Sequence, residues 1–462
     1  MQQNTQTNEM GTGNIPKLFF KLAIPAVIAQ VVNLLYNIVD RIYIGHIPEV
    51  GASALTGVGL FTAMLMLITA FAMLCGAGGA PLAAIALGKK DNDQAEKIMT
   101  NSFMLLIVFA AILTIVLYIL APTLLTMFGA SEVTLPFALD YARIYILGSV
   151  FVLIVLGMTP FVTTQGFAKV AMMTTVIGAV INIILDPIFI FVFNMGVKGA
   201  ATATVISQAV GALWVLRFLT GKKTILKLKK ENFKLDPKIF GPSLALGISP
   251  FIMVSTESLL SISFTTSLAK YGGDVAVGAM TIITSINMLV TMPLQGFTQG
   301  GQPIISYNFG AGNKERVKKA FFMQFGVCVG YAALFWIICM LAPNMLAGIF
   351  TSNTALVEYG AWALRIYMAG IFSVGFQLAC QQSFMALGQA AISLVMAFLR
   401  KLVLLIPLIF ILPNFFTDKV FGVFVAEPVS DIIAASVTTI VFFTQFNKIL
   451  NKQKKAETAQ AE

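Results

Sequence analysis

Two apolar stretches of this sequence each carry a carboxylic acid beside other oxygen-bearing side chains. The first stretch holds, at helical spacing, Asn33, Tyr36, Asn37 and Asp40. The second, NIILDPIFIF at 182–191, holds Asn182 and Asp186 one helical turn apart. An ionised carboxylate loses hydration worth on the order of several kcal/mol when it leaves water. These acids are therefore the first candidates for a functional site.

The chemistry that such acids could perform is ion binding. Two carboxylates in one low-dielectric cavity repel each other, so at least one must hold a proton or recruit a cation. Amide and hydroxyl oxygens nearby suit a hard cation such as sodium. Two structural interpretations stay open: an ion pair of Asp40 with Arg41, and the capping of a helix broken at Pro187.

The composition places these stretches in a membrane. Of 462 residues, 58% are hydrophobic and 11% are charged, whereas globular domains are about 25% charged. The mean hydropathy is +0.88. Four cysteines without CxxC spacing and a single histidine, His46, argue against a metal centre or a disulfide framework. We predict an all-α integral membrane protein rather than a soluble enzyme.

Apolar segments of about 20 residues or more are long enough to cross a bilayer as helices. The sequence predicts twelve such spans, at 16–39, 53–79, 97–120, 136–160, 168–193, 198–219, 240–268, 276–302, 316–341, 356–382, 389–412 and 420–446.

Lysine and arginine predict the orientation, because short cytoplasmic connections concentrate them. The connection at 220–239 and the tail after 446 are the most basic segments. Both termini are therefore expected in the cytoplasm, in a multi-pass protein of the cell (inner) membrane. At about 1.5 Å per residue, Asp40 and Asp186 then fall in the outer part of the bilayer. The net charge of +10 reflects this topology, and we expect no nucleic-acid partner.

An internal repeat at an offset of roughly 222 residues organises the spans. The stretch APTLLTMFGASEVTLPFALDYARIYILG (121–148) matches APNMLAGIFTSNTALVEYGAWALRIYMAG (342–370). Two six-helix lobes running the same way are predicted. The predicted divisions are a cytoplasmic segment 1–15, an N-terminal lobe 16–219, a basic linker 220–239, a C-terminal lobe 240–446 and a cytoplasmic tail 447–462.

The loops GKKDNDQAEK (88–97) and GAGNKERVKK (310–319) also correspond, each as a glycine turn before a charged helix start. In the first loop, Asp93 and Glu96 have the spacing of a capping box. We predict a structural rather than a catalytic role for both.

The acid cluster is not repeated in the second lobe. The repeat aligns Thr265 with Asp40 and Ile406 with Asp186. The second lobe has its own charged residues within spans, which are Glu257, Arg400, Lys401 and Asp431. Neutralisation of these charges by one another and contact with a substrate are both open interpretations.

A repeated bundle suits alternating access, whereas a channel would need a filter or rings of like charge. A membrane enzyme would need a clustered nucleophile, metal ligands or an acid and base pair, so we expect none. A central cavity is predicted from methionine, phenylalanine and glutamine on several spans, which adapt to varied apolar ligands. Its candidate residues are Glu257, Met288, Met292, Gln295, Gln299, Phe376, Gln377 and Gln381.

Together these features resemble the multidrug and toxic compound extrusion (MATE) family. The resemblance covers nearly the whole chain and rests on Pro25 with Asp40, on NIILDPIFIF, on GVKGAATAT (196–204) and on PLQGFTQGGQP (293–303). Within the family it is closer to the bacterial branches of DinF and MepA than to NorM. Some branches also place an acid in span ten, where this chain has only glutamines.

The resemblance implies drug export driven by inward flow of protons or sodium. It implicates Asp40, Asn182, Asp186 and Thr204 in coupling, with Thr202 as the alternative threonine, and Pro25 as a hinge. We expect no cofactor besides H⁺ or Na⁺ as the coupling ion. The expected partners are drugs or toxic organic cations and the lipid bilayer, and the expected state is a monomer. A flippase of lipid-linked oligosaccharide is the alternative function, and a nontransporting scaffold or receptor is a third.

Overall fold

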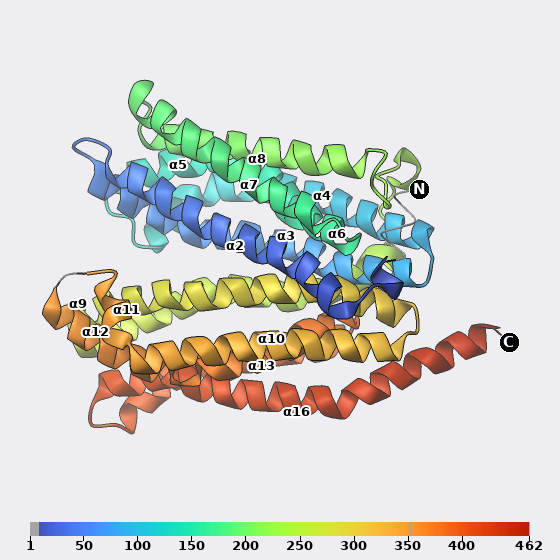
Figure 1. Cartoon of the computed structure of the whole chain (residues 1–462). Helices are drawn as coiled ribbons and strands as arrows, with labels where there is room; N and C mark the ends of the chain where they lie inside the picture. Colours follow the sequence, from blue (N-terminus) through green and yellow to red (C-terminus); the bar gives the residue numbers. More distant parts are fainter. Residues whose placement is uncertain (1–8, 352, 462) are drawn as a thin grey trace. The chain divides into compact units, whose positions relative to one another are not determined.

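The computed structural model of the chain describes residues 9–351 and 353–461. Residues 1–8 of the predicted N-terminal segment and residue 462 of the predicted tail lie outside this range. The described chain is helical almost throughout, as the sequence predicts (Figure 1). Within each compact unit the long helices run side by side.

The elements follow one another in a simple order. In the first half of the chain they are α2 (Ile15–Gly45), α3 (Gly51–Gly88), α4 (Asn92–Met127), α5 (Leu135–Leu147), α6 (Ser149–Thr164), α7 (Ala168–Pro187), η1 (Ile188–Val192), α8 (Val197–Leu219) and η2 (Lys230–Asn232). In the second half they are α9 (Pro237–Gly310), α10 (Lys314–Leu341), α11 (Pro343–Gly348), α12 (Thr354–Tyr367), η3 (Met368–Gly370), α13 (Ile371–Ala386), α14 (Ala390–Phe398), η4 (Leu399–Leu405), α15 (Ile406–Ile411), η5 (Leu412–Asn414) and α16 (Lys419–Ala461).

These elements account for the twelve predicted spans. Ten helices among the described residues are long and apolar enough to cross a membrane, and α5 with α6 forms one further span bent by 56°. The longest helix, α9, holds two predicted spans. It is interrupted at Gly273, where φ is 61°, a conformation that a residue with a Cβ rarely adopts. The prediction of twelve transmembrane helices is therefore confirmed.

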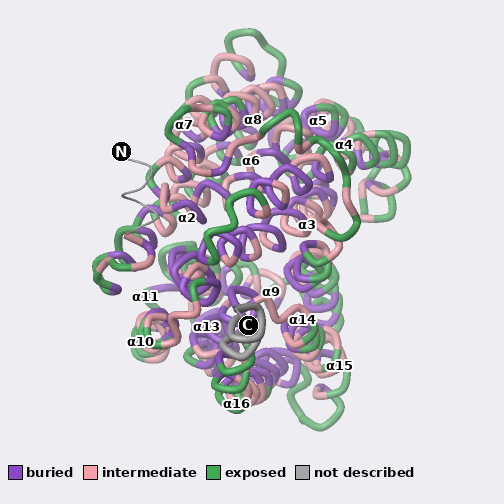
Figure 2. The backbone as a smooth tube through the Cα atoms, turned by 90° about the vertical axis from the view of Figure 1, so that its right-hand side faces the viewer, coloured by how far each residue is buried: buried purple, intermediate pink, exposed green. Residues whose placement is uncertain are grey.

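The first compact unit comprises residues 9–13 and 28–254. Its centre is the contact between α3 and α6, whose backbones approach closely because both helices carry small residues. A Cβ on Gly76 would lie 2.6 Å from the carbonyl oxygen of Gly157. Figure 2 colours much of α6 as buried. Phe161 is one of its fully buried residues. Close helix packing of this kind is typical of membrane bundles, where small residues replace the hydrophobic effect as the cause of association.

The second unit comprises residues 14–27 and 255–461. Its interior has a core of stacked rings in which Phe321 of α10 lies 4.4 Å, centroid to centroid, from Phe442 of α16. The first turns of α2 also belong to this unit. A Cβ on Gly296 of α9 would lie 2.6 Å from the Cα of Val27. Only glycine at position 296 therefore lets the backbones of α2 and α9 approach this closely.

This grouping differs from the predicted lobes at two segments. Residues 14–27 join the second unit, although the sequence assigns 16–27 to the first lobe, and residues 240–254 join the first unit, although the sequence assigns them to the second. The reason is close backbone packing, since Gly247 of α9 lies against Leu74 of α3. The predicted boundaries at 219 and 240 remain a prediction based on the repeat.

The internal repeat is visible in the helix breaks and caps. The span formed by α5 and α6 bends at Gly148, and the corresponding span of the second unit changes to the short helix η3 that ends at Gly370. In both charged loops, the last residue before the helix caps the helix with its side chain. Asp91 accepts a hydrogen bond of 2.9 Å from the backbone of Gln94, and Asn313 accepts one of 3.2 Å from Arg316.

The predicted capping box at Asp93 and Glu96 is wrong. Asp91 caps α4 instead, and Asp93 forms an ion pair of 2.5 Å with Lys97. The carboxylate of Glu96 is buried against the basic linker, where it accepts a hydrogen bond of 3.1 Å from the backbone of Lys227. The spacing of Asp93 and Glu96 could not distinguish a helix cap from a contact with the linker, because the partners of Glu96 lie more than a hundred residues away in sequence.

Glu96 and Gln165 hold the basic linker against the first unit. Oε1 of Gln165 accepts hydrogen bonds of 2.7 to 2.9 Å from Thr224, Ile225 and Leu226. Oε2 of Glu96 lies 2.5 Å from Nζ of Lys229, and this carboxylate raises the pKa of the Lys229 ammonium. The ion pair is therefore formed at neutral pH and is lost only as the pH rises through the elevated lysine pKa.

Candidate functional site

The polar cluster of the first unit is centred on α7 and α8. Asn182 and Asp186 lie one turn apart on α7, where 1% and 0% of their surfaces are exposed. Nδ2 of Asn182 donates a hydrogen bond of 3.0 Å to Oδ1 of Asp186 and one of 3.3 Å to Oγ1 of Thr204. The structure therefore brings together three of the predicted ion-coupling residues.

Asp40 of α2 joins this cluster and is 8% exposed. The carboxyl groups of Asp40 and Asp186 are close enough to interact with each other. Arg41 is exposed, and among the described residues no ion pair joins it to Asp40. The carboxyl group nearest to Asp40 is therefore that of Asp186, and Arg41 contributes only through its charge.

Three buried oxygens of the cluster accept no hydrogen bond from the described residues. They are Oδ1 of Asp40, Oδ1 of Asn182 and Oδ2 of Asp186. Buried polar atoms nearly always have a partner, so this group needs an explanation. A proton on one carboxyl, or a hard cation bound by the oxygens together, would satisfy them.

Aromatic side chains enclose the acids. Tyr36 of α2 is half-buried, and Tyr141 and Tyr145 of α5 are 6% and 5% exposed. The rings of Tyr141 and Tyr145 are stacked at 5.9 Å, and both contact Phe61 of α3. These rings keep the carboxyl groups away from bulk water. The sequence interpretation included Tyr36 but missed Tyr141, although the spacing of four residues from Tyr145 in an apolar span was a usable signal.

Two polar residues considered from the sequence form hydrogen bonds within their own helices. Asn37 is exposed, and its Nδ2 donates a hydrogen bond of 2.6 Å to the carbonyl of Asn33 on its own helix. Thr202 donates to the carbonyl of Lys198 at 2.7 Å. Of the two threonines in the GAATAT stretch, only Thr204 therefore lies in the cluster.

The residues predicted for a substrate cavity fall into two groups in the second unit. Met288, Gln295 and Gln299 are exposed along α9, and Met292 beside them is half-buried. In contrast, Gln377 and Gln381 of α13 are 3% and 1% exposed. Nε2 of Gln381 donates a hydrogen bond of 2.8 Å to the carbonyl of Ser393. The predicted cavity residues of α9 are thus mostly exposed, whereas Gln381 holds α13 to α14.

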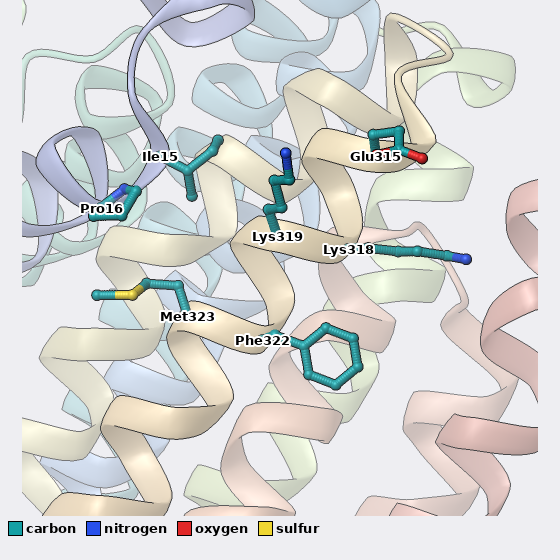
Figure 3. A pocket seen from close by; sticks show the side chains of 7 residues that line it. All are labelled: Ile15, Pro16, Glu315, Lys318, Lys319, Phe322 and Met323. Atoms are coloured by element: carbon teal, nitrogen blue, oxygen red, sulfur yellow. The ribbon is translucent and has the colours of Figure 1, made fainter.

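A pocket of about 470 Å³ lies elsewhere in the second unit, between the start of α2 and the start of α10 (Figure 3). Its lining residues are Ile15, Pro16, Glu315, Lys318, Lys319, Phe322 and Met323. Two ammonium groups and one carboxylate make it basic. It contains none of the residues predicted to contact an organic cation.

The charged residues of the second unit form one network. Lys401 of η4 is buried and pairs with Glu257 of α9, while Arg400 donates through Nε to Oδ1 of Asp431 at 2.9 Å. Glu427 of α16, which the sequence interpretation missed, lies 3.8 Å from Nη2 of Arg400. Its spacing of four residues from Asp431 within an apolar span was the signal that could have found it.

Comparison with known proteins decides the family. The MatE family model matches residues 25–188 and 250–411, more than half of the chain and once in each repeat. This chain belongs to the MatE family. The two matched segments begin at Pro25 and Pro250, the prolines by which the repeat aligns spans one and seven.

The MatE relatives include proteins of staphylococci. The chain is 25% identical over 438 residues to the "Multidrug export protein MepA" of Staphylococcus aureus (strain N315), covering 92% of this chain and 94% of the relative. It is also 25% identical over 426 residues to the protein of that name from Staphylococcus haemolyticus, covering 91% and 92%.

Solved structures of MatE proteins share the fold. A structure described as "MATE in the bent conformation" has a TM-score of 0.90 at 24% identity and covers 97% of this chain and 99% of its own. An outward-facing "multidrug resistance MATE family transporter" has a TM-score of 0.89, with 96% and 98% covered. A transporter from Pyrococcus furiosus, described as having a binding pocket of reversed polarity, also has a TM-score of 0.89.

Proposed function

We propose that this protein is a secondary active multidrug antiporter that exports organic, often cationic, compounds in exchange for H⁺ or Na⁺. The observation that carries the proposal is the group of three buried, unsatisfied oxygens on Asp40, Asn182 and Asp186. The names of the staphylococcal relatives support drug export as the transported reaction. The sequence also shows no clustered nucleophile and base of the kind that a membrane enzyme would need.

The coupling ion acts on the first unit. Binding of a proton or of sodium removes the repulsion between Asp40 and Asp186, which lets α2 pack more closely against α7. The segment of α2 around Pro25 is the proposed hinge, because proline removes a backbone hydrogen bond within the helix. The contact partners of α2 change between Val27 and Ile28, just beyond this proline. Ion entry from outside would thus be linked to outward release of the drug.

The exposed face of α9 is the proposed site of substrate contact. Met288, Met292, Gln295 and Gln299 lie at helical spacing, and methionine adapts to ligands of different shape. Glu257, on the first span within the same long helix, has a side chain that is 56% exposed. A carboxylate exposed on a spanning helix attracts an organic cation in a water-filled cavity.

The test is ethidium efflux from vesicles with a sodium gradient and a proton gradient imposed separately. We expect one gradient to drive efflux, and Asp40→Asn and Asp186→Asn each to abolish it. The matched control is Asp140→Asn, because Asp140 lies on α5 of the same unit but forms only a surface ion pair of 3.5 Å with Lys198. Unchanged gradient-driven efflux in both acid variants would show that the coupling assignment is wrong.

The same vesicles separate drug export from lipid flipping. A flippase would translocate a lipid-linked oligosaccharide and leave ethidium efflux independent of the ion gradient. Ethidium efflux that collapses with the gradient supports the antiporter, whereas oligosaccharide translocation without dye efflux contradicts it.

A further inference from the structure

The charged network of the second unit contains more carboxylates than cations. It joins three acids, Glu257, Glu427 and Asp431, to two bases, Arg400 and Lys401. If all five were ionised, Lys401 would compensate Glu257, and the two buried acids, Glu427 and Asp431, would share the single cation of Arg400. A buried charge without a full counter-charge costs on the order of several kcal/mol. One of the two buried acids must therefore be neutralised in another way.

Two of the three acids have dedicated partners. Asp431, 2% exposed, receives both Nε of Arg400 at 2.9 Å and Nη2 at 2.8 Å on its Oδ1. Glu257 pairs with Lys401, which compensates its charge, and its side chain is 56% exposed. Neither acid needs a proton.

Glu427 is the acid without a partner of its own. It is 8% exposed, its Oε1 lies 3.8 Å from Arg400, beyond hydrogen-bond distance, and its buried Oε2 has no hydrogen-bond partner. Arg400 already directs two nitrogens to Asp431. The carboxyl of Glu427 is thus held in the network by packing and not by a donor.

The groups that face Glu427 favour a proton over a metal ion. On η4 they are Arg400 and Lys401, on α9 Glu257, on α16 Asp431 and on α12 the phenol of Tyr367. The neighbouring elements η3, α15 and η5 carry no titratable side chain, and the only one on α13 is the thiol of Cys380. Two cations beside the carboxyl repel a metal ion, whereas a proton turns the carboxylate into a neutral group that needs no counter-charge.

The position of Glu427 corresponds to that of the first acid cluster. The repeat offset of about 222 residues relates Glu427 on α16 to the turn of α8 that carries Thr204, and η4 to the middle of α7. In each unit, buried polar groups therefore gather where the fifth and sixth spans meet. Close approach is also repeated, since Gly148 lies against Val205 and Gly370 against Pro428.

We propose that Glu427 is a proton-binding site of the second unit, separate from the Asp40 and Asp186 cluster. The carboxyl holds its proton at neutral pH and releases it when the balance of the network changes. This assignment does not depend on drug transport, so it is tested at equilibrium on the purified chain in lipid nanodiscs.

The first experiment measures the carboxylic acid C=O band in the infrared spectrum at neutral pH. Asp40→Asn with Asp186→Asn serves as the background, which removes the acids of the first unit. We expect a band in this background that is lost on adding Glu427→Gln and retained with Glu358→Gln, an exposed glutamate on α12. Labelling glutamate with ¹³C should shift the same band in the protein that keeps Glu427, which identifies the band as that of a glutamate without a substitution. A band unaffected by Glu427→Gln, or by the label, overturns the proposal.

The second experiment compares melting temperatures. Glutamine resembles the protonated form of glutamate, so Glu427→Gln should melt at or above the temperature of the wild type. If Glu427 were ionised and paired with Arg400, the variant would melt lower, which contradicts the proposal. Sodium chloride should stabilise the wild type no more than choline chloride does. Stabilisation by sodium that Glu427→Gln removes would identify a cation site and overturn the proton assignment.

Discussion

Nδ2 of Asn182 lies 3.0 Å from Oδ1 of Asp186, one helical turn further along α7, and both side chains are almost completely buried. The same nitrogen reaches Thr204 of α8. The amide thus fixes the orientation of the carboxylate and leaves its second oxygen, Oδ2, without a hydrogen-bond partner, beside the carboxyl of Asp40. In the proposed antiporter, this arrangement sets the geometry in which the coupling ion is bound.

Thr204 and Thr202 provide a matched pair for testing that geometry. Thr204→Ala removes the hydroxyl that accepts from Asn182, so the apparent affinity for the coupling ion should fall on the order of tenfold, as for loss of an orienting partner. Thr202→Ala should have no effect, because Thr202 bonds only to its own helix. The measurement is the efflux rate in proteoliposomes against coupling-ion concentration. Equal effects of the two substitutions would contradict the assignment of Thr204.

The cap of α4 can be tested by comparing two neighbouring acids. Asp91→Ala removes the hydrogen bond to Gln94 and should reduce the free energy of unfolding by about 1 kcal/mol. Asp93→Ala removes a solvent-exposed ion pair with Lys97 and should have a smaller effect. Thermal denaturation of the purified variants measures both. A larger loss for Asp93→Ala would restore the capping box that the sequence predicts.

The close packing of α2 against α9 predicts a strong effect of one added methyl group. In Gly296→Ala the new Cβ would lie 2.6 Å from the backbone of Val27, so we expect a loss of about 1–3 kcal/mol from overpacking. Gly330→Ala on α10 is the control, because no heavy atom lies within 4 Å of its added Cβ. That variant should be as stable as the wild type or more so, since alanine favours helix. Melting temperatures that rank the variants the other way would exclude this packing.

The attachment of the basic linker predicts a change in protease sensitivity. Gln165→Ala removes the acceptor of the backbone donors of Ile225 and Leu226, and unsatisfied buried donors cost about 1–3 kcal/mol each, whereas the hydroxyl of Thr224 keeps its hydrogen bond to the carbonyl of Leu226. We expect the linker to open and trypsin to cleave faster at its lysines. Gln94→Ala, at the first turn of α4, is the control and should be cleaved at the wild-type rate. Cleavage of Gln165→Ala at that same rate would contradict the attachment.

The sequence predicted the spans well but the partners of polar groups poorly. All twelve apolar segments lie almost entirely within helices, although several helices extend beyond the predicted spans, as α3 does to Gly88 and α16 to Ala461. In contrast, the role of Glu96 was assigned from local spacing and was wrong, because its partners lie in the linker. Glu427 was overlooked, because the cation nearest to it, Arg400, lies on η4 and not on its own helix.

What the sequence determined by itself is the number of helices, their hydrophobic lengths, the repeat and the presence of acids within spans. A bilayer requires long apolar segments whose backbone groups are hydrogen-bonded within the segment. The residue types of each segment alone are enough to recognise it. What the tertiary structure decided is which acids meet. Asp40 and Asp186 lie on helices separated by more than a hundred residues, and only the packing of α2 on α7 and α8 brings their oxygens together. Glu427 and Arg400 meet for the same reason, because side-chain contacts depend on how helices pack and not on their distance along the chain.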